Sequence, residues 1–137
     1  MSCVLRIMGV DFDPDGFEIK SGLSLGRKLY KGTPRFKSKP DSEKAQHSVI
    51  SFVVSSADFH SPEKQIEDAK NYLIINKDGL SHILNDKSIQ HAFLDFGLQF
   101  YPDRVTQSIY LPHDIVSPAG ALGIGIEISL YNNDRFE

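Results

Sequence analysis

Three aspartates at alternate positions, followed by a glycine, have the spacing that most suggests chemistry in this sequence. Asp11, Asp13 and Asp15 stand before Gly16 in the stretch GVDFDPDGFEIKSG. A calcium-binding loop of the helix-loop-helix type begins in this way, but it also requires a bidentate glutamate at its twelfth position. Counted from Asp11, the twelfth residue is Gly22, so the pattern indicates no metal site here.

The same residues are typical of the start of a helix. Asp13 can accept hydrogen bonds from the free backbone donors of a first turn, and Pro14 suits the first helical position. Asp15 then favours the positive end of the helix dipole. We expect a short helix over residues 14–21, closed by Gly22.

The remaining reactive side chains are scattered along the chain. Cys3 lies in an apolar stretch, which is typical of a small core residue rather than of a reactive thiol. No histidine stands three or four residues from another, so none forms a helical metal pair. The histidines are His47, His60, His82, His91 and His113. We therefore assign no catalytic residue, no metal ligand and no cofactor.

Polar side chains on a sheet face are a second candidate site. Asp95 and Gln99 are predicted on the solvent-facing side of a strand over 91–101, and Glu127 on that of the last strand. If these strands are neighbours, Asp95 and Glu127 could act as an acid and base pair. Acids on such a face more often only keep a protein soluble. A third alternative is that this charged face binds a protein partner.

A basic segment is the third candidate site. Residues 27–39 contain 6 of the 15 Lys and Arg residues and no acid, so the rest of the chain has 9 of them against 18 acids. This segment could bind a phosphate or nucleic-acid ligand, form a lysine-protected edge of a sheet, or dock an acidic protein. The acidic remainder disfavours broad contact with nucleic acid or with an anionic membrane. The ligand-binding candidates are Arg27, Lys28, Lys31, Arg35 and Lys37.

These side chains must be positioned by strands, which the two-residue alternation predicts. The clearest alternation covers 91–101, and a second one over 105–111 follows the Pro102-Asp103 turn, so we expect a hairpin. Residues 23–30 resemble an exposed edge strand. Three further strands are predicted at 3–9, 47–55 and 124–130.

Helices are predicted between these strands. Ser61-Pro62-Glu63 is a strong helix start, and Asp78 can cap a second short helix. Ser117-Pro118 repeats the signal before the last strand. The order predicts an α+β fold, with a single mixed, mostly antiparallel sheet of about six strands and two or three helices packed on one face.

The bulk composition bounds the class of protein. A chain of 137 residues, with 40% apolar and 24% charged residues, is one ordinary domain, which we place at 1–131 with a frayed tail at 132–137. The single cysteine favours a reducing compartment. No secretory signal or membrane-length apolar run is present, so we expect a cytoplasmic protein.

The beginning and end of the chain resemble a known family. The stretch VLRIMGVDFDPDGFEIKSGLSLGRKLYKGTPRF is similar to the start of the bacterial domain-of-unknown-function family 4279, and LGIGIEISLY is similar to its last strand. Together they cover about a third of the chain. The resemblance implies a bacterial, intracellular, single-domain protein and implies no activity. The likeness is carried by Leu5, Ile7, Gly9, Asp11, Asp13, Lys31, Gly32 and Pro34.

Three classes of function stay open. The first is a non-enzymatic protein-binding module, of which a toxin-immunity protein is one form. The second is binding of a phosphate or nucleic acid by the basic segment. The third is an enzyme that uses acids on the sheet face. In addition, the edge around residues 23–36 could pair with itself in a homodimer.

Overall fold

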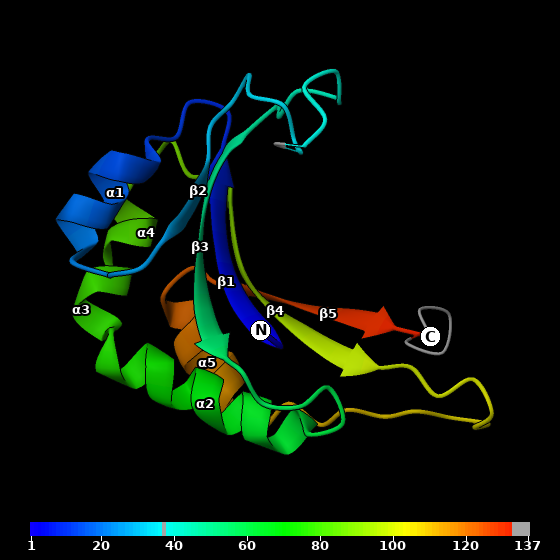
Figure 1. Ribbon diagram of the computed structural model, residues 1–137. Helices are drawn as coiled ribbons and strands as arrows, with labels where there is room; N and C mark the ends of the chain where they lie inside the picture. Colours follow the sequence, from blue (N-terminus) through cyan, green and yellow to red (C-terminus); the bar gives the residue numbers. More distant parts are fainter. Residues whose placement is uncertain (37, 133–137) are drawn as a thin grey trace.

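The sheet is the scaffold of the molecule. A computed structural model describes residues 1–36 and 38–132 and contains one five-stranded sheet in the order β2-β3-β1-β4-β5 (Figure 1). Pairing is antiparallel except between β4 and β5, which run parallel. The strands are β1 (Cys3–Gly9), β2 (Arg27–Leu29), β3 (Ser48–Ser55), β4 (His91–Gln99) and β5 (Gly125–Tyr131).

All the helices of the described residues lie on one face of this sheet, and none of them packs on the opposite, concave face (Figure 1). This confirms the predicted α+β class with a mixed sheet and helices on one side. Five strands stand where about six were expected. The helices are α1 (Pro14–Ser21), α2 (Pro62–Ile75), α3 (Lys77–Leu80), α4 (His82–Asn85) and α5 (His113–Ala121).

The core lies between the helices and the sheet. Cys3, Leu5 and Ile7 of β1 are fully buried, and their β-strand alternation turns Val4 and Arg6 to the concave face. Leu94 and Phe96 of β4 are buried on the helical side in the same way. The helices contribute the buried side chains Phe17, Ala69, Leu73, Leu80, Ile83, Ile115 and Ala119.

Helix α1 begins and ends as predicted. The Asp13 carboxylate accepts a hydrogen bond from the Gly16 amide at 3.1 Å, and Pro14 occupies the first turn. Gly22 closes the helix with a φ of 71°, a left-handed conformation that glycine adopts without a Cβ clash. The aspartate-rich stretch is therefore a helix start.

Helix α2 also begins at its predicted signal, with Pro62 directly after Ser61. Its buried side includes Gln65, whose side-chain amide donates to the carbonyl oxygens of Gly97 at 2.8 Å and Asp58 at 3.2 Å. These bonds fasten the helix to β4 and to the loop that precedes α2.

The predicted hairpin between 91–101 and 105–111 is wrong. Strand β4 already has β1 on one edge and β5 on the other, so no edge is left for a further strand. Residues 105–111 instead form a non-helical, non-strand connection. The Gln107 side chain attaches it by donating to the Gln99 carbonyl at 2.7 Å and accepting from the Tyr101 amide at 3.1 Å.

Three further boundaries differ from the prediction. Helix α3 begins at Lys77, so Asp78 lies inside it and does not cap it. Helix α5 begins at His113, so Pro118 lies inside it rather than at its start. The helix begins about one turn earlier than predicted because this buries both Ile115 and Ala119. The exposed strand expected over 23–30 shortens to Arg27–Leu29. Strand β5 ends at Tyr131, and residues 133–137 of the predicted tail lie outside the described residues.

Candidate functional site: the open face of the sheet

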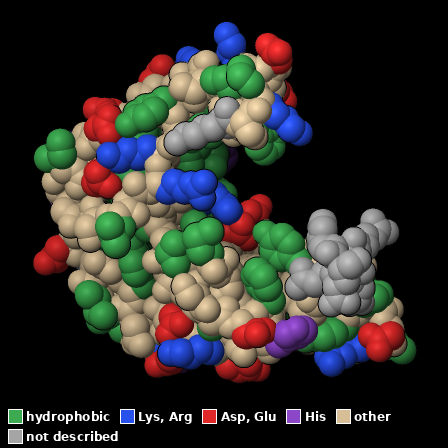
Figure 2. Space-filling model, in the orientation of Figure 1, with side chains coloured by type: hydrophobic (Ala, Val, Ile, Leu, Met, Phe, Trp, Pro, Cys, Tyr) green, Lys and Arg blue, Asp and Glu red, His purple; other side chains and the backbone are tan. Residues whose placement is uncertain are grey.

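We call the concave, helix-free side of the sheet the open face. Figure 2 shows it as a hollow with charged and hydrophobic side chains on its wall. The loop between β2 and β3 rises at one end, and the loop after β4 extends at the other (Figure 1). Strand alternation and register place on this face Val4, Arg6, Met8, Arg27, Leu29, Val49, Ser51, Val53, His91, Phe93, Asp95, Gly97, Gln99, Gly125, Glu127, Ser129 and Tyr131.

A partly buried ion pair lies at the bottom of the open face. The Arg6 guanidinium of β1 donates to Asp95 Oδ2 of β4, and the Ser129 hydroxyl of β5 donates to Asp95 Oδ1 at 2.6 Å. Asp95 is only 8% exposed, so its charge needs these partners. Three adjacent strands thus contribute to one fixed polar group, which we call the Arg6–Asp95–Ser129 triad.

The structure brings Asp95 and Glu127 side by side, because they are register partners on the parallel strands β4 and β5. They differ in environment, since Asp95 is buried and Glu127 is exposed. Both Asp95 oxygens bond to Arg6 and Ser129 rather than to Glu127. The prediction that Asp95 meets solvent is wrong, because the arginine and the serine lie against it.

The far end of the open face is covered by aromatic rings. Phe59, in the loop after β3, lies 5.5 Å from the Tyr131 ring, centroid to centroid. A Cβ at Gly97 would lie 2.9 Å from Phe59 and 3.1 Å from Tyr131, so both rings pack on this glycine. Gln99 is also buried here, at 6% exposure, although we predicted it to be solvent-facing.

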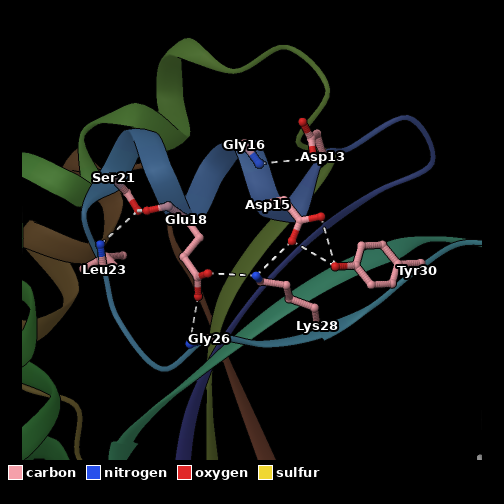
Figure 3. Close-up of polar contacts among 9 residues, drawn as sticks. All are labelled: Asp13, Asp15, Gly16, Glu18, Ser21, Leu23, Gly26, Lys28 and Tyr30. Carbon is pink, nitrogen blue, oxygen red and sulfur yellow. Dashed lines mark hydrogen bonds and ion pairs between the residues drawn. The ribbon is translucent and has the colours of Figure 1, made fainter.

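The basic segment does not gather its cations at one place. Lys28 is bound on the helical side, where its ammonium contacts Asp15 at 2.9 Å and Glu18 at 2.8 Å (Figure 3). These hydrogen bonds lower the pKa of both carboxyls and raise the pKa of Lys28. Tyr30 also donates to Asp15, at 2.9 Å. Lys28 therefore fastens strand β2 to helix α1.

The other predicted cations have different surroundings. Arg27 faces the opposite way from Lys28, onto the open face, by strand alternation. Lys31 and Arg35 are exposed on the loop after β2, and Lys37 lies outside the described residues. Among the predicted cations that the structure describes, only Arg27 joins Asp95, Gln99 and Glu127 on one surface.

A polar pocket beside α2 had no signal in the sequence. It has a volume of about 350 Å³ and is lined by residues from the loop after β3, the end of β4 and the connection to α5. His60 Nδ1 lies 2.5 Å from the Tyr101 hydroxyl, and the Arg104 guanidinium lies 3.9 Å from the centroid of the Tyr101 ring. His60 comes from the loop after β3, whereas Tyr101 and Arg104 come from the loop after β4, so no local spacing could reveal the whole group.

Cys3 is a core residue, as its apolar surroundings suggested. It is fully buried in the central strand. Burial, with smaller contributions from Asp95 and Asp68, raises the pKa of its thiol to about 12. The thiol is therefore protonated at neutral pH and shielded from reagents.

Comparison with known proteins adds no relative. Models of protein families, curated proteins and solved structures were each compared with the chain, and none matches it. The resemblance to the domain-of-unknown-function family 4279 stays a prediction. Within residues 1–36 and 38–132, no helix combines the length and apolar composition that crossing a bilayer requires.

Proposed function

We propose that this chain is a non-enzymatic protein-binding module and that its partner seats on the open face. The observation that carries the proposal is the concave sheet surface, on which no helix of the described chain packs and at the bottom of which lies the Arg6–Asp95–Ser129 triad. A recessed surface suits a convex protein segment.

The composition of the open face supports a protein partner. Apolar side chains such as Val53, which is 48% exposed, stand beside charged ones. Protein interfaces combine apolar area with polar groups that fix orientation in this way. Because the triad satisfies its own charges, the bottom of the open face needs no rearrangement when a partner binds, which reduces the cost of association.

The charges at the two ends of the open face define the partner's chemistry. Arg27 lies on β2 at one edge of the sheet, and Glu127 lies on β5 at the other. A partner with an acid near Arg27 and a base near Glu127 would be steered into one orientation. The face therefore has charges of both signs, since Arg6 and Arg27 share the surface with Asp95 and Glu127.

A toxin-immunity protein is the specific form of this function that we propose. Such a protein acts by covering its partner and needs no chemistry of its own. The lone buried cysteine fits the reducing cytoplasm, where a toxin would be neutralised. The product of a neighbouring gene, if it encodes a secreted toxin, is the first partner to test.

The test is a charge reversal at both ends of the open face. The variant Arg27→Glu with Glu127→Arg keeps the net charge, as does the control Lys20→Glu with Glu63→Lys, whose exposed residues lie on α1 and α2. Calorimetry with the toxin should show loss of affinity in the first variant and none in the control. Equal affinity of both variants would contradict binding through the open face.

A further inference from the structure

The outer edge of β5 is an unpaired strand of seven residues. Strand β5 is the last in the sheet order, with β4 on its inner side. Within residues 1–36 and 38–132, no hydrogen bond reaches the outer edge from another segment. An edge of this length is a template for pairing with another strand.

The direction of the free backbone groups follows from one contact. The Phe100 amide donates to the Tyr131 carbonyl at 2.8 Å, so the backbone polar groups of Tyr131 face β4. In a strand, these groups alternate between the two edges. The amide and carbonyl groups of Ile126, Ile128 and Leu130 therefore face outward.

The side chains of the same three residues point to the helical side and are incompletely covered. Ile128 is 38% exposed and Leu130 is 51% exposed. Strand β5, GIEISLY, contains no lysine, arginine or proline, which are the residues that keep sheet edges from pairing. The opposite edge, β2, has three residues, and two of them are Arg27 and Lys28. One edge of the sheet is thus protected, and the other is open.

We propose that the outer edge of β5 pairs antiparallel with β5 of a second copy of this chain, about a two-fold axis at Ile128. In this register Ile128 faces its own copy, and Ile126 faces Leu130 of the second copy. The three outward-facing residues of each chain then exchange about six hydrogen bonds. The two sheets join into one.

Charge and shape fit this register. Glu127, the single charged residue of β5, stands opposite Ser129 of the second copy, so no like charges face each other directly. The exposed parts of Ile126, Ile128 and Leu130 form one apolar stripe across the two chains. The contact is one strand wide, which places its buried area at the low end for specific interfaces, so the dimer forms at high protein concentration.

Sedimentation of the full chain and cysteine cross-linking test the proposal. Wild-type protein should move from the mass of one chain to that of two as its concentration rises. Under oxidation, Ile128→Cys should give a disulfide-linked dimer, because paired antiparallel Cα atoms lie about 5.5 Å apart. Arg27→Cys, on the β2 edge, should not cross-link. Wild-type protein is a second control, because its Cys3 is buried and should not form a disulfide between chains.

A proline variant isolates the backbone contribution. Ile128→Pro removes an outward amide that no described residue uses, so it should abolish the dimer and leave the melting temperature of the monomer little changed. If that variant does not fold, Leu130→Lys provides the same test through the exposed side chain. One-chain mass at all concentrations, a dimer that persists in the folded proline variant, or cross-linking through Arg27→Cys instead would overturn the proposal.

Discussion

Arg6 and Asp95 are joined diagonally across two neighbouring strands. The register partner of Arg6 on β4 is Phe93, two residues before Asp95, so the guanidinium reaches along the open face to meet the carboxylate. Diagonal pairs of this kind are within reach of long side chains. The ion pair thereby links β1, the central strand, to the half of the sheet that contains β5.

Removal of Arg6 should leave a buried carboxylate without its main partner. We expect Arg6→Met to lower the free energy of unfolding by about 2 kcal/mol, because Ser129 still donates to Asp95 and the arginine is partly exposed. The double variant Arg6→Met with Asp95→Leu should recover most of this loss, since no buried charge remains. Urea unfolding measures both, and a double variant less stable than Arg6→Met would contradict this account.

The Lys28 ion pairs should make stability depend on acid pH. Their hydrogen bonds lower the folded-state pKa values of Asp15 and Glu18 below the ordinary values of 3.8 and 4.5. This stabilisation is therefore present above the ordinary values and is lost as the pH falls through the lowered ones. Lys28→Met should be less stable than wild type at neutral pH, and the difference should disappear in acid. Unfolding curves of wild type and Lys28→Met, measured from neutral to acid pH, test this prediction. A stability difference between the two proteins that stays the same in acid would refute it.

Replacement by alanine should change the stability of the protein in opposite directions at two glycines, Gly9 and Gly120. A Cβ at Gly9, at the end of β1, would lie 2.0 Å from the Ser88 carbonyl oxygen, and this backbone atom cannot move away cheaply. Gly9→Ala should destabilise the protein by about 2 kcal/mol. At Gly120, in α5, a Cβ would meet no described atom within 4 Å outside the backbone of its own helix, so Gly120→Ala should stabilise by about 0.5 kcal/mol. Thermal melts compare them, and equal melting temperatures would show that the Gly9 contact is not tight.

The Cys3 thiol should report global unfolding. Because it is fully buried and its pKa is raised to about 12, a disulfide reagent should modify it only when the protein unfolds. The rate of thiol modification should rise with denaturant concentration in parallel with the unfolded fraction of the protein. Fast modification of the native protein would mean that β1 is locally accessible.

The raised pKa of Cys3 also predicts that the free energy of unfolding falls as the pH rises above 9. Above that pH the thiol ionises in the unfolded protein but not in the folded one.

Sequence patterns predicted the fold where local rules decide it. The cap at Asp13 and the helix start at Pro62 depend on neighbouring residues, and both were confirmed. Alternation over 91–101 predicted a strand with Leu94 and Phe96 inside, which is also confirmed. Each of these signals is contained within a few consecutive residues.

The failures have a different origin, since they depend on which strands become neighbours. Residues 105–111 alternate like a strand, but β5 occupies the edge of β4 that a hairpin would need. Asp95 was predicted to meet solvent, but Arg6, 89 positions away along the chain, lies against it. No local pattern shows that Phe59 would cover Gly97 or that His60 would meet Tyr101.

The central position of β1 has a consequence for synthesis of the chain. Strand β1 pairs with β3 and with β4, and β4 lies much later in the chain, so the pairing of β1 is complete only after Gln99 has been synthesised. Until then, one edge of β1 has no strand to pair with, and unpaired edges in incomplete folds bind chaperones or aggregate. Nascent chains cut before β4 should therefore be held by chaperones rather than accumulate as folded fragments.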